Sequence, residues 1–223
     1  NFSARFVGGG NFAGHIMFNP LVLDLSHHNK IASFQMIFDY GVRGVILKAT
    51  QGSGYVDPTY AKRKLAAKAA GLAVGAYHFA SSGPPDAQLK HFLDVAELEA
   101  DEIGALDYEP DLKNGDMKFS DARDFLANYE SQMGRKATLY SGHLLKEKLG
   151  TKSDPFLGQH KLWLAQYSAR AKLPPGFDRY FLWQYSDGTS NPTGWNNHVS
   201  GVQGLVDCNH YEGTAEQLLA EWN

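Results

Sequence analysis

The chain has 223 residues, 43% of them hydrophobic and 20% charged, and its formal net charge at pH 7 is −3. This composition is typical of one globular domain, and the weakly acidic balance excludes a general electrostatic attraction to nucleic acid or to anionic membranes. The single cysteine, Cys208, excludes an internal disulfide and a cysteine-based zinc site. No apolar run is long enough for a transmembrane helix, so we expect no membrane insertion.

The first residues, 1–18, are rich in glycine and show no hydrophobic period, which indicates an irregular N-terminal arm. The predicted domain covers residues 19–223. Because position 1 is asparagine and not methionine, removal of a preceding segment is compatible with the sequence, and so is secretion.

From residue 19 to about residue 150, short apolar runs alternate with helical patterns. Strands are predicted at residues 21–27, 44–50, 72–80, 103–109 and 136–142, and helices at 33–40, 57–71, 86–99, 120–134 and 143–149. Asp57 and Ser120 are the N-cap candidates of two of these helices, and Gly134 ends the second of them. Nearly continuous apolar strands separated by helices predict a parallel sheet that is covered on both faces.

After residue 150 the connections carry Pro, Gly and Asn and show no helical period. Three more strands are predicted at residues 161–167, 179–185 and 201–207, and a closing helix at 213–223. Eight strands, of which only the first five are followed by helices, predict a single α/β domain. Its fold is a TIM-like barrel of five β/α units followed by three β-strands.

Acidic side chains fall at the ends of these strands, where such barrels carry their reactive groups. Asp107 and Glu109 follow an apolar strand in the sequence ALDYEP, and they share a face because strand side chains alternate. Asp24 and Asp207 are predicted at the corresponding ends of the first and last strands. Cleavage of a glycosidic bond needs a carboxylic acid to protonate the leaving oxygen and a second negative group to support the transition state. The crowded carboxylates therefore predict a glycosidase site, in which one pKa is raised.

Aromatic and amide side chains occur at the same strand ends, and rings of this kind stack on the C–H faces of sugars. The candidates for substrate binding are Tyr77, Tyr140, Trp163, Tyr167 and Gln184. For Trp163, which lies within a strand, a core position is equally consistent with the sequence. Trp195 lies in a loop rich in Asn and Gly and is a candidate sugar platform. Lys48 is interpreted as a solvated or ion-paired lysine.

Three alternative functions are less consistent with these patterns. A zinc amidase would need metal ligands, but the histidines show no zinc-binding spacing, so no metal and no cofactor are expected; His78 is the histidine expected nearest the cleft. A chitinase-like hydrolase would need acids where Ala105 and Ile103 stand. A catalytically silent glycan-binding barrel remains an alternative, because the sequence does not give the distances between the acids.

From about residue 20 to residue 223 the chain resembles glycoside hydrolase family 25, the lysozymes (N-acetylmuramidases) that include phage endolysins and bacterial autolysins. The resemblance is carried, in order, by the segments LVLDLSHHN, ALDYEP, ATLYSG, LWLAQY, FLWQYSDG and GLVDCNHYEG. It implies a flattened barrel of five β/α units and three further strands. It also implies action on the cell wall outside the cytoplasm, and we expect a monomer.

The resemblance also implies roles for the acids. Glu109 would be the general acid, Asp107 would assist the 2-acetamido group of the substrate, and Asp24 and Asp207 match two further acidic positions. Tyr77, Tyr140, Trp163 and Tyr167 match positions expected in the groove. The implied partner is the glycan strand of peptidoglycan, cut with retention of configuration at the β-1,4 bond between N-acetylmuramic acid and N-acetylglucosamine.

Overall fold

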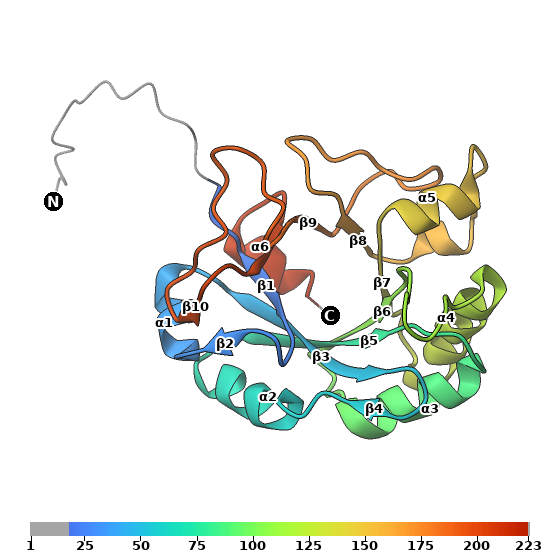
Figure 1. The fold of residues 1–223 in the computed structure, drawn as a ribbon, viewed down its shortest axis with the longest axis horizontal. Coiled ribbons are helices and arrows are strands. Elements are labelled where there is room, and N and C mark those ends of the chain that lie inside the picture. The colour runs from blue at the N-terminus through green and yellow to red at the C-terminus, as the bar shows by residue number, and fades with distance from the viewer. Residues whose placement is uncertain (1–17, 223) are drawn as a thin grey trace, which may run out of the picture.

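The computed structural model of the protein describes residues 18–222 (Figure 1). The arm predicted for residues 1–18 lies outside the described residues except for Phe18, whose ring stacks on Trp195 with 4.2 Å between the centroids. Among residues 18–222, no helix combines the length and the apolar character needed to cross a membrane.

Eight strands close into a barrel, as the sequence predicts. In spatial order they are β1 (Val22–Leu25), β3 (Gly44–Gln51), β5 (Ala73–Phe79), β6 (Ile103–Asp107), β7 (Thr138–Ser141), β8 (Leu162–Ala165), β9 (Leu182–Asp187) and β11 (Asp207–His210). The neighbouring strands are parallel except where β11 pairs with β9 and β1. Pairing of β1 with both β3 and β11 closes the barrel and leaves it without a free edge.

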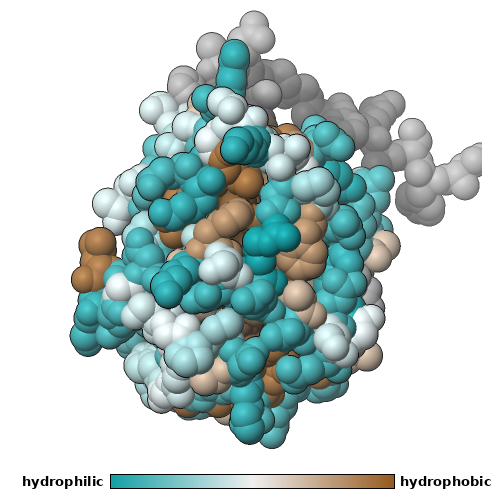
Figure 2. Space-filling view, turned by 90° about the vertical axis from the view of Figure 1, so that its right-hand side faces the viewer, coloured by the Kyte–Doolittle hydropathy of each residue, from teal (hydrophilic) through white to brown (hydrophobic). Residues whose placement is uncertain are grey.

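Helices lie around the outside of the strands (Figure 1). They are α1 (Phe34–Tyr40), α2 (Tyr60–Ala69), α3 (Pro85–Ala96), α4 (Phe119–Met133), α5 (His143–Leu149) and α6 (Ala215–Ala220), with a 3-10 turn at Leu157–Gln159. The connections that follow β8 and β9 contain no α-helix, as predicted. Figure 2 views the molecule from the side of α4 and α5, where hydrophilic residues surround a central group of hydrophobic ones.

Two helix starts differ from the prediction. Asp57 does not cap α2 directly, because its carboxylate accepts hydrogen bonds from the backbone N–H (2.8 Å) and the hydroxyl (2.6 Å) of Thr59 and holds a turn that precedes the helix. Helix α4 begins at Phe119, so Ser120 lies in its first turn. The predicted end of α4 is confirmed, since Gly134 adopts a φ of 67°, which favours glycine.

The strand predicted at residues 201–207 is divided into two. Gly201 and Gly204 both have positive φ, and the short β10 (Val202–Gln203) between them pairs with β2 (Lys30–Ile31) in a separate sheet. The eighth barrel strand is β11, which runs antiparallel to its neighbours. Its first residue, Asp207, therefore lies at the edge where the parallel strands end and pairs opposite Asp24.

The strand side chains alternate between two apolar layers. Outward residues pack beneath the helices, and inward residues form a second cluster inside the barrel: Val22, Ile46, Ile103, Ala105, Tyr140, Trp163 and Leu182. Trp222 belongs to this inner cluster. A Cβ atom on Gly44, the first residue of β3, would lie 2.5 Å from the Trp222 ring, and the indole Nε1 donates to the carbonyl of Val74 at 3.0 Å. Trp222 thus fills the end of the barrel where the parallel strands begin.

We expect Trp222→Ala to lower the free energy of unfolding by about 3–5 kcal/mol, because it empties a site filled by a buried aromatic ring and removes its hydrogen bond. Urea denaturation followed by circular dichroism measures this. Leu219→Ala is the matched control, since Leu219 on α6 is 45% exposed; its effect should stay within about 0.5 kcal/mol. Equal losses in the two variants would contradict the role given to Trp222.

Candidate active site

Four carboxylates meet at the edge of the barrel where the parallel strands end. Asp24 is the third of the four residues of β1, Asp107 ends β6, Glu109 follows two residues later, and Asp207 begins β11. Asp24 pairs opposite Asp207, and burial, together with the charge of Asp24, raises the pKa of each of the other three carboxyl groups. The structure therefore brings together the four acids predicted from the sequence.

Burial is the main reason that these carboxyl groups titrate at unusual pH. Desolvation and the charge of Asp24 raise the pKa of Glu109 to about 7, although Lys48 opposes the shift. Desolvation and repulsion from Asp24 raise the pKa of Asp207 to about 9. For Asp107, burial and the charge of Glu109 raise the pKa well above its ordinary value. Near neutral pH the cluster consequently holds protons on some carboxyl groups, which is the condition for a general acid.

Asp24 is anchored by amide donors from two neighbouring strands. The side-chain amide of Gln184 donates to both of its carboxylate oxygens, at 3.0 and 2.9 Å, and that of Asn209 donates to Oδ2 at 2.8 Å. A further hydrogen bond joins Asp24 to Asp207. These bonds favour the ionised form of Asp24 against the burial that raises its pKa.

A layer of aromatic side chains supports these amides. The hydroxyls of Tyr140 and Tyr167 donate to the Gln184 oxygen at 2.8 and 2.9 Å, and the indole N–H of Trp163 donates to the Asn209 oxygen at 2.6 Å. The orientation of both amides is thereby fixed. Asn209 is a positioning residue. Its place at a strand end with Asp207 follows from the sequence, but its role does not.

The predicted sugar-contacting residues differ in exposure. Tyr167 is 39% exposed and Tyr77 is partly exposed, whereas Trp163 is only 1% exposed. The Trp163 ring makes edge contacts with Tyr140 and Tyr77, at centroid distances of 4.6 and 6.2 Å. Of the two positions that the sequence allows for Trp163, the structure shows the core position, where it supports the two tyrosines from beneath.

Asp107 has one oxygen with no hydrogen-bond partner. Its side chain is 5% exposed, and Oδ1 is buried and unpaired among the described residues. An unpaired buried acceptor is costly, and active sites are where such groups occur. The neighbouring Tyr77 interacts with the same acids. Burial is the largest cause of its raised pKa, and the charges of all four acids raise this pKa further. Asp107 is thus a carboxyl group whose hydrogen-bonding capacity the fold leaves partly unused.

Lys48 is the cation that faces the acids. Its ammonium group donates to the Gln51 oxygen at 2.8 Å and lies 4.6 Å from the centre of the Phe79 ring. Burial lowers its pKa, and the charges of Asp107 and Glu109 oppose that shift. From the sequence, Lys48 was expected to be solvated or ion-paired. Its place in the site follows from the alternation of β3, which puts Lys48 on the inward face with Ile46.

Two sequence-based expectations are wrong. His78 was expected nearest the cleft, but it follows Tyr77 in β5 and so faces the opposite side of the sheet, where it is fully buried and stacks on Phe125. This burial lowers its pKa to about 4. Trp195 was a candidate exposed platform, yet it packs against the apolar core and the ring of Tyr185. In both cases apolar packing partners distant in sequence determine the position.

The arrangement is suited to acid–base chemistry on a neutral ligand. Within residues 18–222, no group of three or more His, Cys, Asp or Glu side chains is placed to hold a metal ion. Instead, a partly exposed carboxyl group with a pKa near neutrality stands beside a buried carboxyl group that has an unpaired oxygen. Such a pair can donate a proton to a leaving oxygen and support positive charge that develops next to it.

Comparisons with known proteins identify relatives of this chain. Residues 23–193 match the family described as Glycosyl hydrolases family 25. Lysozyme M1 of Streptomyces globisporus is 29% identical over 217 residues, covering 89% of this chain and 69% of that protein. The N,O-diacetylmuramidase of Chalaropsis is 28% identical, covering 80% of this chain and 92% of that protein. The crystal structure of a bacterial lysozyme from Streptomyces coelicolor superposes with a TM-score of 0.79 at 26% identity, covering 90% of this chain and 95% of that one.

Proposed function

The chain belongs to glycosyl hydrolases family 25 and is a glycoside hydrolase, and from this premise we propose that it is an N-acetylmuramidase. It cleaves the β-1,4 bond between N-acetylmuramic acid and N-acetylglucosamine in peptidoglycan and retains the configuration at the anomeric carbon. The observation that carries the proposal is the cluster of Glu109, Asp107, Asp24 and Asp207, in which one carboxyl group titrates near neutrality beside a buried one. Names of related proteins, lysozyme and diacetylmuramidase, support this choice of substrate.

Glu109 acts as the general acid. Its pKa of about 7 keeps it protonated in mildly acidic solution, and its partial exposure lets it reach a glycosidic oxygen. In the first step the Glu109 proton passes to that oxygen while the bond to the anomeric carbon breaks. In the second step the resulting carboxylate takes a proton from the water that attacks the anomeric carbon.

The substrate itself supplies the nucleophile. The carbonyl oxygen of the 2-acetamido group attacks the anomeric carbon as the leaving group departs, and a cyclic oxazolinium ion forms. The Asp107 carboxylate accepts a hydrogen bond from the acetamido N–H and stabilises the positive charge that develops there. Water then opens the ring, so that two inversions give net retention.

Asp24 and Asp207 set the charge of the site. Asp207, whose pKa is raised to about 9, holds a proton that it shares in a hydrogen bond with Asp24. The amides of Gln184 and Asn209 hold Asp24 in place, and its negative charge keeps the pKa of Glu109 high. Tyr77 and Tyr167 form the wall of the groove against which the sugar packs, and the buried rings of Tyr140 and Trp163 support them. These residues act on the cell wall, outside the cytoplasm, without a cofactor.

Product analysis tests the proposal. Purified peptidoglycan is digested, the products are reduced with borohydride, and the reduced sugar is identified by mass spectrometry. Reduced muramic acid ends support the muramidase assignment. Reduced glucosamine ends would assign a different glycosidase, released peptides would indicate an amidase, and wall binding without new ends would leave only a glycan-binding barrel.

We expect activity to fall as the pH rises through about 7, because Glu109 must carry its proton and its pKa is raised to about 7, first by burial and then by Asp24. The pH dependence of kcat/KM on solubilised glycan measures this decline. Asp24→Asn removes the repelling charge and is expected to shift the decline to lower pH. An alkaline optimum, or a decline that shifts to higher pH in Asp24→Asn, would contradict the assignment.

A further inference from the structure

A pocket of about 670 Å³ adjoins the four acids on the side of β3. It lies between the residues that follow β1, the turn between β3 and β4 (Tyr55–Val56), and the loops after β5 and β6. Its charged and aromatic lining residues are His27, His28, Lys48, Tyr55 and Lys113. Lys48 belongs to both places, since it lines this pocket and also faces Asp107 and Glu109. Lys48 therefore links the pocket to the four acids.

The pocket has a basic lining. Among residues 18–222, two lysines and two histidines line it, and no aspartate or glutamate does so. Apart from the four acids, two carboxylates stand behind this surface, and both already accept hydrogen bonds. Asp57 accepts from the backbone N–H of His27 at 2.8 Å, and Asp111 accepts from Ser81 and Asn114 at 2.6 and 2.9 Å. An anion in the pocket would thus meet donors and positive charge.

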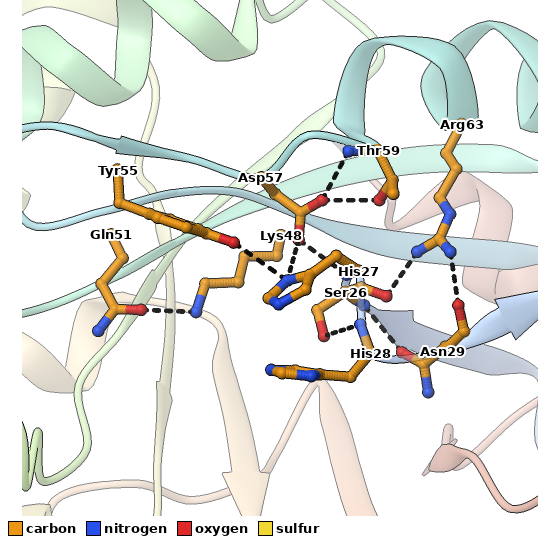
Figure 3. A network of polar contacts seen from close by, with 10 residues as sticks. All are labelled: Ser26, His27, His28, Asn29, Lys48, Gln51, Tyr55, Asp57, Thr59 and Arg63. Atoms are coloured by element: carbon orange, nitrogen blue, oxygen red, sulfur yellow. Dashed lines mark hydrogen bonds and ion pairs between the residues drawn. The ribbon is translucent and has the colours of Figure 1, made fainter.

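The histidines are held in place before any ligand arrives. Asp57 Oδ2 lies 3.1 Å from Nδ1 of His27, and the hydroxyl of Tyr55 lies 3.1 Å from the same nitrogen (Figure 3). The imidazole rings of His27 and His28 lie against each other with centroids 3.9 Å apart, and their planes are tilted by 40°. Among the described residues Nε2 of His27 has no hydrogen-bond partner. With Nδ1 fixed, Nε2 is the atom available to a ligand.

The loop that carries Lys113 is also rigid. Asp111 Oδ1 accepts hydrogen bonds from the backbone N–H groups of Lys113 and Asn114, both at 3.0 Å. The amide of Gln51, which is itself bonded to Lys48, donates to Asp111 Oδ2 at 3.1 Å. One buried carboxylate therefore connects the base of the Lys113 loop to the lysine that faces the catalytic acids.

We propose that this pocket binds a carboxylate of the peptide attached to the muramic acid residue beside the cut bond, an inference that rests on the proposed function. The sugar rings of a peptidoglycan strand are uncharged where the muramic acid carboxyl is joined to its peptide, so the negative charge of the substrate lies on the peptide branches. The four acids repel such a charge, whereas the adjoining basic pocket attracts it. The enzyme is accordingly selective for peptide-bearing glycan.

The test uses soluble glycan–peptide fragments from peptidoglycan stripped of phosphate polymers. Half of the sample is treated with a carbodiimide and ammonia, which converts its carboxylates to amides and leaves the sugars unchanged. We expect kcat/KM of the wild-type enzyme to be about three- to tenfold higher on the untreated fragments, a range set by one or two partly solvated charge pairs. The ratio should shrink at high ionic strength, because salt screens exposed charges.

The double variant His28→Gln/Lys113→Gln should lower the ratio of kcat/KM on untreated to amidated fragments to about one. Both side chains are exposed, so their replacement is compatible with folding, and the unfolding temperature verifies this. Lys62→Gln, on the outer helix α2, is the matched control and should keep the wild-type ratio. Three results would overturn the proposal. The wild-type ratio could be one, the double variant could leave the ratio unchanged, or selectivity could occur only in walls that retain phosphate polymers. If neither substrate yields muramic acid ends, the proposed function itself fails.

Discussion

Replacing Glu109 with Gln is expected to lower kcat for muramidase activity by about 10²–10⁴-fold, the usual contribution of a general acid. The amide has nearly the shape of the carboxylic acid but cannot transfer a proton to the leaving oxygen. Reducing-end assays on solubilised glycan at pH 6, where the wild-type acid is largely protonated, measure the effect. Binding of uncleaved glycan should change little, because the shape of the groove is preserved.

The unfolding temperature of Glu109→Gln distinguishes a loss of catalysis from a loss of the folded structure. The folded-state pKa of Glu109, about 7, exceeds its ordinary value of 4.5. As the pH rises from 4.5 toward 7, the unfolded chain releases this proton before the folded protein does, so this group makes the folded state progressively less stable. At pH 8 Glu109→Gln should therefore unfold at the same temperature as the wild type or higher. Glu147→Gln, at an exposed position of α5, is the control and should keep full activity. Wild-type turnover by a folded Glu109→Gln protein would refute the assignment.

Asp107→Asn is expected to lower kcat by about 10²–10³-fold with a much smaller change in KM. The carboxylate matters most when the acetamido group becomes positively charged in the transition state, and an amide oxygen supplies no compensating charge. A steady-state comparison of kcat and KM with the same glycan measures this.

Asp101→Asn is the matched control, since Asp101 is exposed in the loop before β6. It should retain both kinetic constants. If Asp107→Asn weakened ground-state binding as much as it lowered the rate, Asp107 would be a binding residue and the substrate-assisted mechanism would lose its support.

The architecture could be predicted because it follows from short-range patterns. Apolar runs such as that of β6 predict strands buried on both faces. The lack of a helical period after residue 150 predicts connections without helices. Asp107 and Glu109 could be paired because alternation along one strand needs no knowledge of the rest of the fold. Their proximity to Asp24 and Asp207 followed from the rule that parallel barrels place reactive groups at strand ends.

What escaped prediction depends on contacts between distant segments. The sequence places Asp207 at a strand end, but only the pairing with Asp24 shows that β11 runs in the opposite direction and starts there. His78 was expected near the cleft because a strand end does not reveal which of two adjacent side chains faces inward. Asn209 holds Asp24 through a hydrogen bond between residues that are 185 positions apart in the sequence. Strand periodicity carries no information about such partners.

The closure of the barrel has a consequence for how the protein is made. Strand β1 is synthesised long before one of its two neighbours, β11, and Trp222 follows later still. Because Asp24 and Asp207 come from these two strands, the cluster of four acids cannot assemble until β11 has left the ribosome. Until then the growing chain carries an unpaired sheet edge on β1, a feature that favours chaperone binding.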